Sequence, residues 1–137
     1  MEQPGPEYPT EQQIILRTED AVRAYAVMMN TLNLTSFEPL LAEDFHYASQ
    51  WVFHEIESKQ EYLDYITRKL RAIKASDSKV WAELAQSDNG PCVVMAQDEK
   101  DNTLSVVFAE VKDSKIQRMD MCMLELYSGK RTGEYPT

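Results

Sequence analysis

The chain has 137 residues, of which 43% are hydrophobic and 27% charged, so its length fits one domain and its composition is too apolar for a disordered chain. Lysine and arginine number 14 against 23 aspartates and glutamates, and the net charge of −9 makes nucleic acids and anionic membranes poor partners. The sequence has neither an apolar run near the roughly 18 residues of a membrane span nor a secretory signal, so we expect a cytoplasmic protein.

Both ends of the chain are predicted to lie outside a single domain of residues 11–125. Residues 1–10 contain three prolines and a glycine, which is typical of a flexible arm. Residues 126–137 have a similar composition, and we interpret them as a flexible tail.

A first helix is predicted over residues 11–32. Thr10 and Gln13 fit a capping box, and Asn33 is a plausible stop. One apolar stripe follows the helical period and consists of Ile15, Val22, Tyr25, Met29 and Leu32. Thr35 and Ser36 then fit the cap of a short helix with Pro39 in its first turn.

Two strands and a second long helix are predicted next. Residues 44–52 alternate, so that Phe45, Tyr47, Ser49 and Trp51 share one face, and a shorter strand follows at 53–57. The run Ser58-Lys59-Gln60-Glu61 is a second capping box and opens a helix that extends to about residue 74. The apolar face of this helix consists of Tyr62, Leu63, Ile66, Leu70 and Ile73.

The period then changes to two, which predicts a pair of hairpins. Residues 78–87 and 91–98 flank Asn89-Gly90, and a two-residue turn there places Leu84 opposite Met95. Residues 103–111 and 115–125 flank Asp113-Ser114. A tight turn at that point predicts the pairs Phe108 with Met119, Val106 with Met121, and Leu104 with Met123 on the inner face.

This order of elements predicts an α+β domain, in which a curved antiparallel sheet wraps around two long helices and one short helix. The residues also resemble the nuclear transport factor 2-like, or SnoaL-like, superfamily of cone-shaped domains over residues 12–125. The resemblance rests on the segment from Tyr25 to Asn30, on Leu40-Leu41-Ala42-Glu43-Asp44, on Ser58-Lys59 and on the run from Ser114 to Met119. This superfamily includes isomerases, cyclases, dehydratases, ligand-binding proteins and interaction subunits, so the resemblance implies the fold and leaves the activity unassigned.

One specific enzyme of the superfamily, ketosteroid isomerase, can be compared residue by residue. By position Tyr25 matches the tyrosine that donates to the enolate oxygen. Ser49 stands where the family has its carboxylate base and Val106 where it has its second donor, and neither has the required chemistry. The other candidate bases are His46, His54, Glu55, Glu83 and Glu110. From the sequence alone, no two of these groups can be placed within hydrogen-bond reach of each other.

The inward faces predict an adaptable apolar cavity, because methionine side chains are flexible and polarizable. The residues assigned to this ligand-binding pocket are Tyr25, Met29, Tyr47, Ser49, Trp51, Phe53, Ile66, Val106, Phe108, Met119, Met121 and Met123. The predicted function is the binding of a small, largely apolar ligand. Two alternatives stay open: an isomerase, cyclase or dehydratase that uses Tyr25 as its catalytic residue, and an interaction module with a filled core.

Charge and cysteines complete the expectations about partners. Residues 62–79 carry Arg68, Lys69, Arg71, Lys74 and Lys79 against two aspartates, and this basic strip fits either a solvated helix face or a contact with an anion. Cys92 and Cys122 are expected to be reduced, and no metal site or cofactor is predicted. The runs around Val94 and Val107 are apolar on both faces of the sheet, which predicts a homodimer that covers the outer sheet face.

Overall fold

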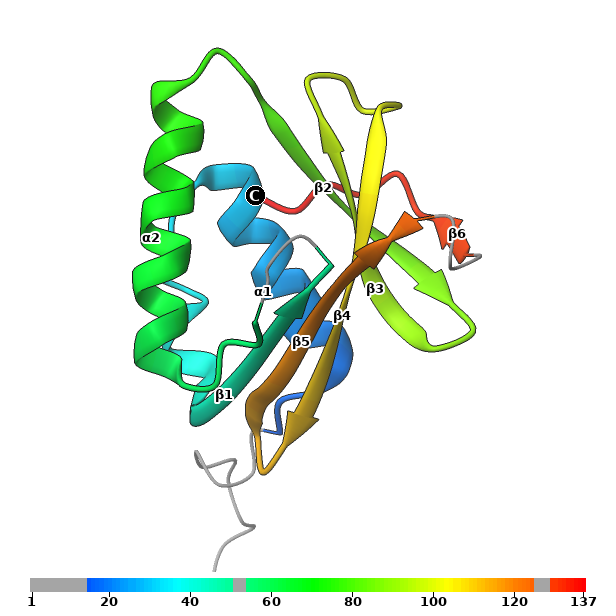
Figure 1. Cartoon of the computed structure of the whole chain (residues 1–137). Coiled ribbons are helices and arrows are strands. Elements are labelled where there is room, and N and C mark those ends of the chain that lie inside the picture. The colour runs from blue at the N-terminus through cyan, green and yellow to red at the C-terminus, as the bar shows by residue number, and fades with distance from the viewer. Residues whose placement is uncertain (1–14, 51–53, 125–128) are drawn as a thin grey trace, which may run out of the picture.

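The computed structural model describes residues 15–50, 54–124 and 129–137, and these form a layer of helices packed on one face of a twisted sheet (Figure 1). The elements in chain order are α1 (Thr18–Thr31), a 3-10 turn (Glu38–Leu40), β1 (Leu41–Ser49), α2 (Lys59–Ala75), β2 (Val80–Ser87), β3 (Gly90–Gln97), β4 (Thr103–Lys112), β5 (Lys115–Met123) and β6 (Gly129–Arg131). The predicted α+β class is confirmed.

The sheet is mixed, whereas the sequence predicted an antiparallel one. Its strand order is β1-β5-β4-β3-β2-β6, and β1 lies parallel to β5 while the other neighbours are antiparallel. The expected strand at 53–57 is reduced to one bridge between Tyr47 and Ile56 among the residues described. The expected short helix is only the three-residue 3-10 turn.

The two helices show how local chemistry sets their ends. Ser58 accepts a hydrogen bond from the backbone N–H of Glu61 at 3.1 Å, which is one half of the predicted capping box. The Glu61 carboxylate accepts from the Glu57 N–H at 3.4 Å instead of from that of Ser58. The first helix starts later than predicted, because Arg17 is its N-cap and the Arg17 N–H donates to the Asp20 carboxylate at 3.0 Å. It ends at Leu32, which adopts a left-handed conformation (φ 56°). Neither helix of the described segments has the length and apolar character that a membrane span requires.

The first hairpin keeps its predicted faces with a different register. The turn residues are Asp88 and Asn89 rather than Asn89 and Gly90, and Leu84 pairs with Val93 instead of Met95. Gly90 has φ of 101°, a conformation that glycine adopts without strain. The register differs from the prediction by two residues, and a two-residue shift preserves which side chains face the core.

The second hairpin has a bulge that the sequence did not predict. The tight turn at Asp113 and Ser114 is confirmed, since both residues have positive φ and Val111 pairs with Ile116 as expected. Gln117 is then an extra residue on β5, because Glu110 pairs with Arg118. Every later pair shifts by one residue, so the predicted pairs Phe108 with Met119, Val106 with Met121, and Leu104 with Met123 are wrong.

The C-terminal segment differs from the predicted flexible tail. Residues Gly129–Arg131 pair with β2, and the backbone N–H of Leu84 donates to the Glu134 carbonyl at 2.9 Å. The Asn30 side chain donates to the Pro136 carbonyl at 2.7 Å. The tail therefore extends the sheet at the edge of β2 and closes the gap between that edge and α1. Residues 1–14 and 125–128 lie outside the described residues, so the predicted N-terminal arm stays a prediction.

Candidate functional site

Half of the predicted pocket residues meet in one packed cluster between the helices and the sheet. They are Tyr25, Met29, Tyr47, Ile66, Met119 and Met121, and all six are buried. The core is thus lined by sulfur and aromatic rings, as the sequence predicted.

Three other predicted pocket residues do not join this cluster. Val106 and Phe108 lie on the outer face of the sheet, where they pack with Cys92 and its neighbours. The bulge at Gln117 is the cause, because a one-residue slip moves the intervening residue Val107 to the inner face opposite Met121. Met123, at the end of β5, is exposed.

The remaining three predicted residues flank the end of β1. Ser49 is half-buried, and its side chain is hydrogen-bonded to that of Tyr47. Trp51 and Phe53 lie outside the described residues, so their assignment to the pocket stays a prediction.

Tyrosines dominate the polar chemistry of the core cluster. The Tyr62 ring lies 4.9 Å from that of Phe45 and 5.2 Å from that of Tyr47, measured between centroids. Burial raises the pKa of the Tyr25, Tyr47 and Tyr62 hydroxyls, so these phenols stay neutral at neutral pH. The Tyr47 hydroxyl donates to the Met121 sulfur at 3.9 Å. Neutral phenols serve as hydrogen-bond donors and are poor bases.

The candidate bases His46 and Glu55 meet on the outer face of the sheet. His46 Nδ1 lies 2.5 Å from a Glu55 carboxylate oxygen, and Arg118 donates two hydrogen bonds to the same carboxylate at 3.0 and 3.1 Å. Arg118 also binds Asp120. Arg118 and then His46 lower the pKa of the Glu55 carboxyl to about 2. His46 and Glu55 therefore belong to an ion network with Arg118 and Asp120 at the surface of the sheet, and this network is separate from the tyrosine cluster.

The other three candidate bases are also separate from the core. His54 is exposed and lies 3.5 Å from a carboxylate oxygen of Glu61. Glu110 is exposed on β4. Glu83 is buried, and its carboxylate accepts hydrogen bonds from Arg131 and other groups of the tail. Among the described residues the core cluster therefore includes no carboxylate and no histidine.

A cavity of about 230 Å³ adjoins the core cluster between α2 and strands β3 and β4. Its lining is mainly apolar and includes one methionine from each of α1, β3 and β5. The lining residues are Met29, Lys69, Val80, Met95, Ala96, Gln97, Leu104, Ser105 and Met121. Met121 joins this cavity, the α2–β4 pocket, to the tyrosine cluster through its contact with Tyr47.

Only two residues of the sequence-predicted pocket, Met29 and Met121, line the α2–β4 pocket. The buried tyrosines Tyr25, Tyr47 and Tyr62 are not among its lining residues. Lys69 belongs to the basic strip seen in the sequence, and it lies one helical turn from Tyr65 on the same helix face. Nothing in the sequence indicated that Gln97 and Ser105 line a pocket.

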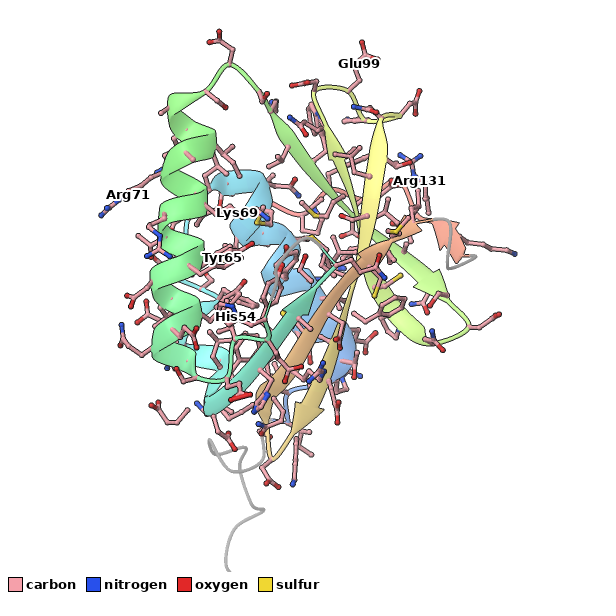
Figure 2. The ribbon with its side chains drawn as sticks, viewed as in Figure 1. His54, Tyr65, Lys69, Arg71, Glu99 and Arg131 are labelled. Carbon is pink, nitrogen blue, oxygen red and sulfur yellow. The ribbon has the colours of Figure 1, made fainter. Side chains whose placement is uncertain are left out.

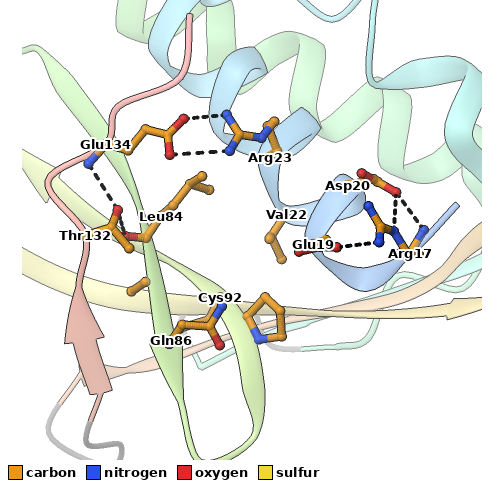
Figure 3. Close-up of a pocket in the computed structure, with 12 residues that line it drawn as sticks. Arg17, Glu19, Asp20, Val22, Arg23, Leu84, Gln86, Cys92, Thr132 and Glu134 are labelled. Carbon is orange, nitrogen blue, oxygen red and sulfur yellow. Dashed lines mark hydrogen bonds and ion pairs between the residues drawn. The ribbon is translucent and has the colours of Figure 1, made fainter.

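A second hollow, of about 340 Å³, lies between α1, β2 and the C-terminal segment (Figure 3). Its charged groups are paired with one another, since Arg23 binds both oxygens of Glu134 and Arg17 pairs with Glu19 and Asp20. The Arg23–Glu134 pair joins α1 to the C-terminal segment, and we interpret this hollow as structural.

No protein-family model matches the chain, and no curated protein matches it in sequence. Solved structures do match. A ketosteroid isomerase-like protein of Kribbella flavida has a TM-score of 0.55 and 27% identity, over 87% of this chain and 82% of that one. A SnoaL-like protein of unknown function from Burkholderia thailandensis has a TM-score of 0.59 and 14% identity, over 79% and 91% of the two chains.

An epoxide hydrolase of M. tuberculosis is a further match, with a TM-score of 0.56 and 14% identity over 80% of this chain and 84% of that one. The chain therefore has the nuclear transport factor 2-like, SnoaL-like fold, and its activity is unassigned. The isomerase comparison by residue becomes weaker, because Val106, at the position of the second donor, lies on the outer sheet face.

Proposed function

We propose that the protein binds a small, largely apolar molecule in the α2–β4 pocket. The observation that carries the proposal is a cavity of about 230 Å³ lined by Met29, Met95 and Met121 and placed against a cluster of neutral tyrosines. Methionine side chains adapt to irregular ligands, and a few polar groups at a mainly apolar wall orient them.

Binding is favoured over catalysis by the placement of the acids and bases. A proton transfer needs a base within about 3 Å of the reacting group. The candidate bases lie on the outer face of the sheet or at the surface, and they are His46, His54, Glu55, Glu83 and Glu110. Tyr25, the candidate catalytic residue, has aromatic neighbours, with the Phe37 ring centroid 5.8 Å from its own.

The proposal predicts that filling the pocket abolishes binding. Leu104 lies at the rim and is 46% exposed, so Leu104→Trp adds a ring to the cavity without disturbing the core. Titration with the neutral probe N-phenyl-1-naphthylamine is expected to give a saturable rise in probe fluorescence for the unmodified chain. Leu104→Trp is expected to weaken this binding about tenfold or more.

Ile15→Trp serves as the matched control, because Ile15 is exposed and does not line the pocket. It is expected to bind the probe as the unmodified chain does. Equal binding by Leu104→Trp and the unmodified chain, or no saturable binding by any of them, overturns the proposal.

We also propose that the protein is a homodimer through the outer sheet face, as the sequence predicted. Support comes from the side chains on this face that stay partly exposed, Phe108, Cys122 and Leu124, which pack over the buried Ala85, Cys92, Val94 and Val106. The helices cover only the opposite face (Figure 1). A second copy related by a two-fold axis would cover these three partly exposed side chains with an identical patch. We also propose that the protein is cytoplasmic, because Cys92 and Cys122, both in the described part of the chain, are not joined in a disulfide.

The dimer predicts a specific result in analytical ultracentrifugation. The unmodified chain is expected to sediment as a dimer at micromolar concentration, and Phe108→Glu as a monomer, because the substitution buries a charge in the interface. Ile15→Glu adds the same charge elsewhere and is expected to leave the dimer intact. A monomeric unmodified chain contradicts the proposal.

A further inference from the structure

We propose that the ligand of the α2–β4 pocket carries one anionic group, such as a carboxylate, and that Lys69 binds it. This inference rests on the function proposed above. Lys69 is the charged residue of the pocket lining, whose remaining members are apolar apart from Gln97 and Ser105. The ligand class is therefore an amphipathic acid, with an apolar body against the methionines and its charge at Lys69.

The surroundings of Lys69 leave its charge uncompensated. The side chain is half-buried, and its Nζ lies 5.8 Å from the centroid of the Tyr65 ring. The ion pairs of the described residues do not include Lys69, although Lys59 on the same helix pairs with Glu43. A ligand that closes the pocket removes water from this ammonium group, and such a group is costly to bury unless an anion pairs with it.

The charge of α2 favours an anion at the same place. Between Lys59 and Ala75 the helix carries five basic and two acidic residues, a net charge of 5 − 2 = +3 in a chain of −9. This local positive field attracts small anions to the helix. Arg68, Arg71 and Lys74 are exposed, so Lys69 is the member of the basic strip that reaches the pocket. Figure 2 shows Arg71 pointing away from the sheet and Lys69 on the side that faces it.

Two probes of the same chain length separate charge from apolar contact. Isothermal titration calorimetry on the full chain with octanoate and with 1-octanol measures binding of the anion and of its uncharged counterpart. We expect the unmodified chain to bind octanoate about tenfold more tightly than 1-octanol, since a charge-assisted hydrogen bond is gained.

Lys69→Met keeps an unbranched apolar stem and removes the charge. It is expected to weaken octanoate binding about tenfold and to leave 1-octanol binding within about twofold. Arg71→Met is the matched control, because it removes one positive charge from the same helix at a residue that points to solvent. It is expected to leave both affinities within about twofold.

The outcomes separate this inference from the proposed function. If both probes bind and Lys69→Met changes neither affinity, the anionic ligand is excluded while the apolar pocket stands. If Lys69→Met and Arg71→Met weaken octanoate equally, the effect is one of net charge and the assignment of Lys69 is wrong. If neither probe binds the unmodified chain, both proposals fail.

Discussion

Tyr62→Ala is expected to lower the free energy of unfolding by about 3–5 kcal/mol, which is the range for removing a large buried aromatic side chain. Tyr62 is fully enclosed, and its ring lies within 6.3 Å of those of Phe37, Phe45, Tyr47 and Tyr65. The substitution would leave a cavity at the point where α2 meets β1. Urea denaturation followed by circular dichroism measures the change.

The control Tyr62→Phe keeps the ring and removes only the hydroxyl, so it is expected to cost about 1 kcal/mol or less. A loss below about 1 kcal/mol for Tyr62→Ala would contradict the interpretation that the aromatic cluster is a packed core. In that case the helices would be held mainly by other contacts.

The side-chain period predicted much of the inner face of the domain, although Ile15, which was assigned to the same stripe, lies before α1 and is exposed. Val22, Tyr25 and Met29 on α1, and Phe45 and Tyr47 on β1, were assigned to the core from spacing alone and are buried. These positions depend on local periodicity alone. The inward faces of the first hairpin were predicted in the same way, and a shift of two residues in its register did not change them.

The second hairpin shows where periodicity fails. The bulge at Gln117 has no signal in the sequence, because an extra residue on a strand leaves the turn and the flanking pattern intact. Val106 and Phe108 were therefore assigned to the pocket, although they belong to the outer face. The error matters for function, because Val106 and Phe108 were assigned to a ligand pocket and lie instead on the face that we propose as the dimer interface.

The α2–β4 pocket was only partly predictable for a different reason. Its walls come from six elements that meet only in the folded chain, namely both helices and strands β2, β3, β4 and β5. Met29 and Met121 could be assigned because each lies on an apolar face. Gln97 and Ser105 are polar residues on strands, and sequence alone gives no reason to place them at a cavity.

The tail provides the last case, because several of its contacts are made to one buried carboxylate that lies far from it in the sequence. Glu83 lies on β2 and only 4% of its side chain is exposed. Its oxygens accept hydrogen bonds from Arg131 Nε at 2.5 Å, from the Gly133 N–H at 2.7 Å and from the Tyr135 hydroxyl at 3.2 Å. A buried carboxylate needs such donors, and the tail is the segment that supplies them.

Arg131→Met is therefore expected to destabilise the protein by roughly 2–3 kcal/mol. This is less than the about 3–5 kcal/mol for breaking a fully buried pair, because Arg131 is 38% exposed and Gly133 and Tyr135 still donate to Glu83. The Leu84 amide donates to the Glu134 carbonyl, so it should lose protection in hydrogen exchange when the tail detaches.

Glu83→Gln should cost less, about 1 kcal/mol, because the Arg131 that it leaves behind is partly exposed and water can solvate it. The double variant Glu83→Gln/Arg131→Met should be no less stable than Arg131→Met alone, since no buried charge remains unpaired. A double-mutant cycle in urea measures this coupling. Additive losses would mean that Arg131 acts through packing rather than through the Glu83 charge, and the anchoring of the tail would then rest on its backbone pairing with β2.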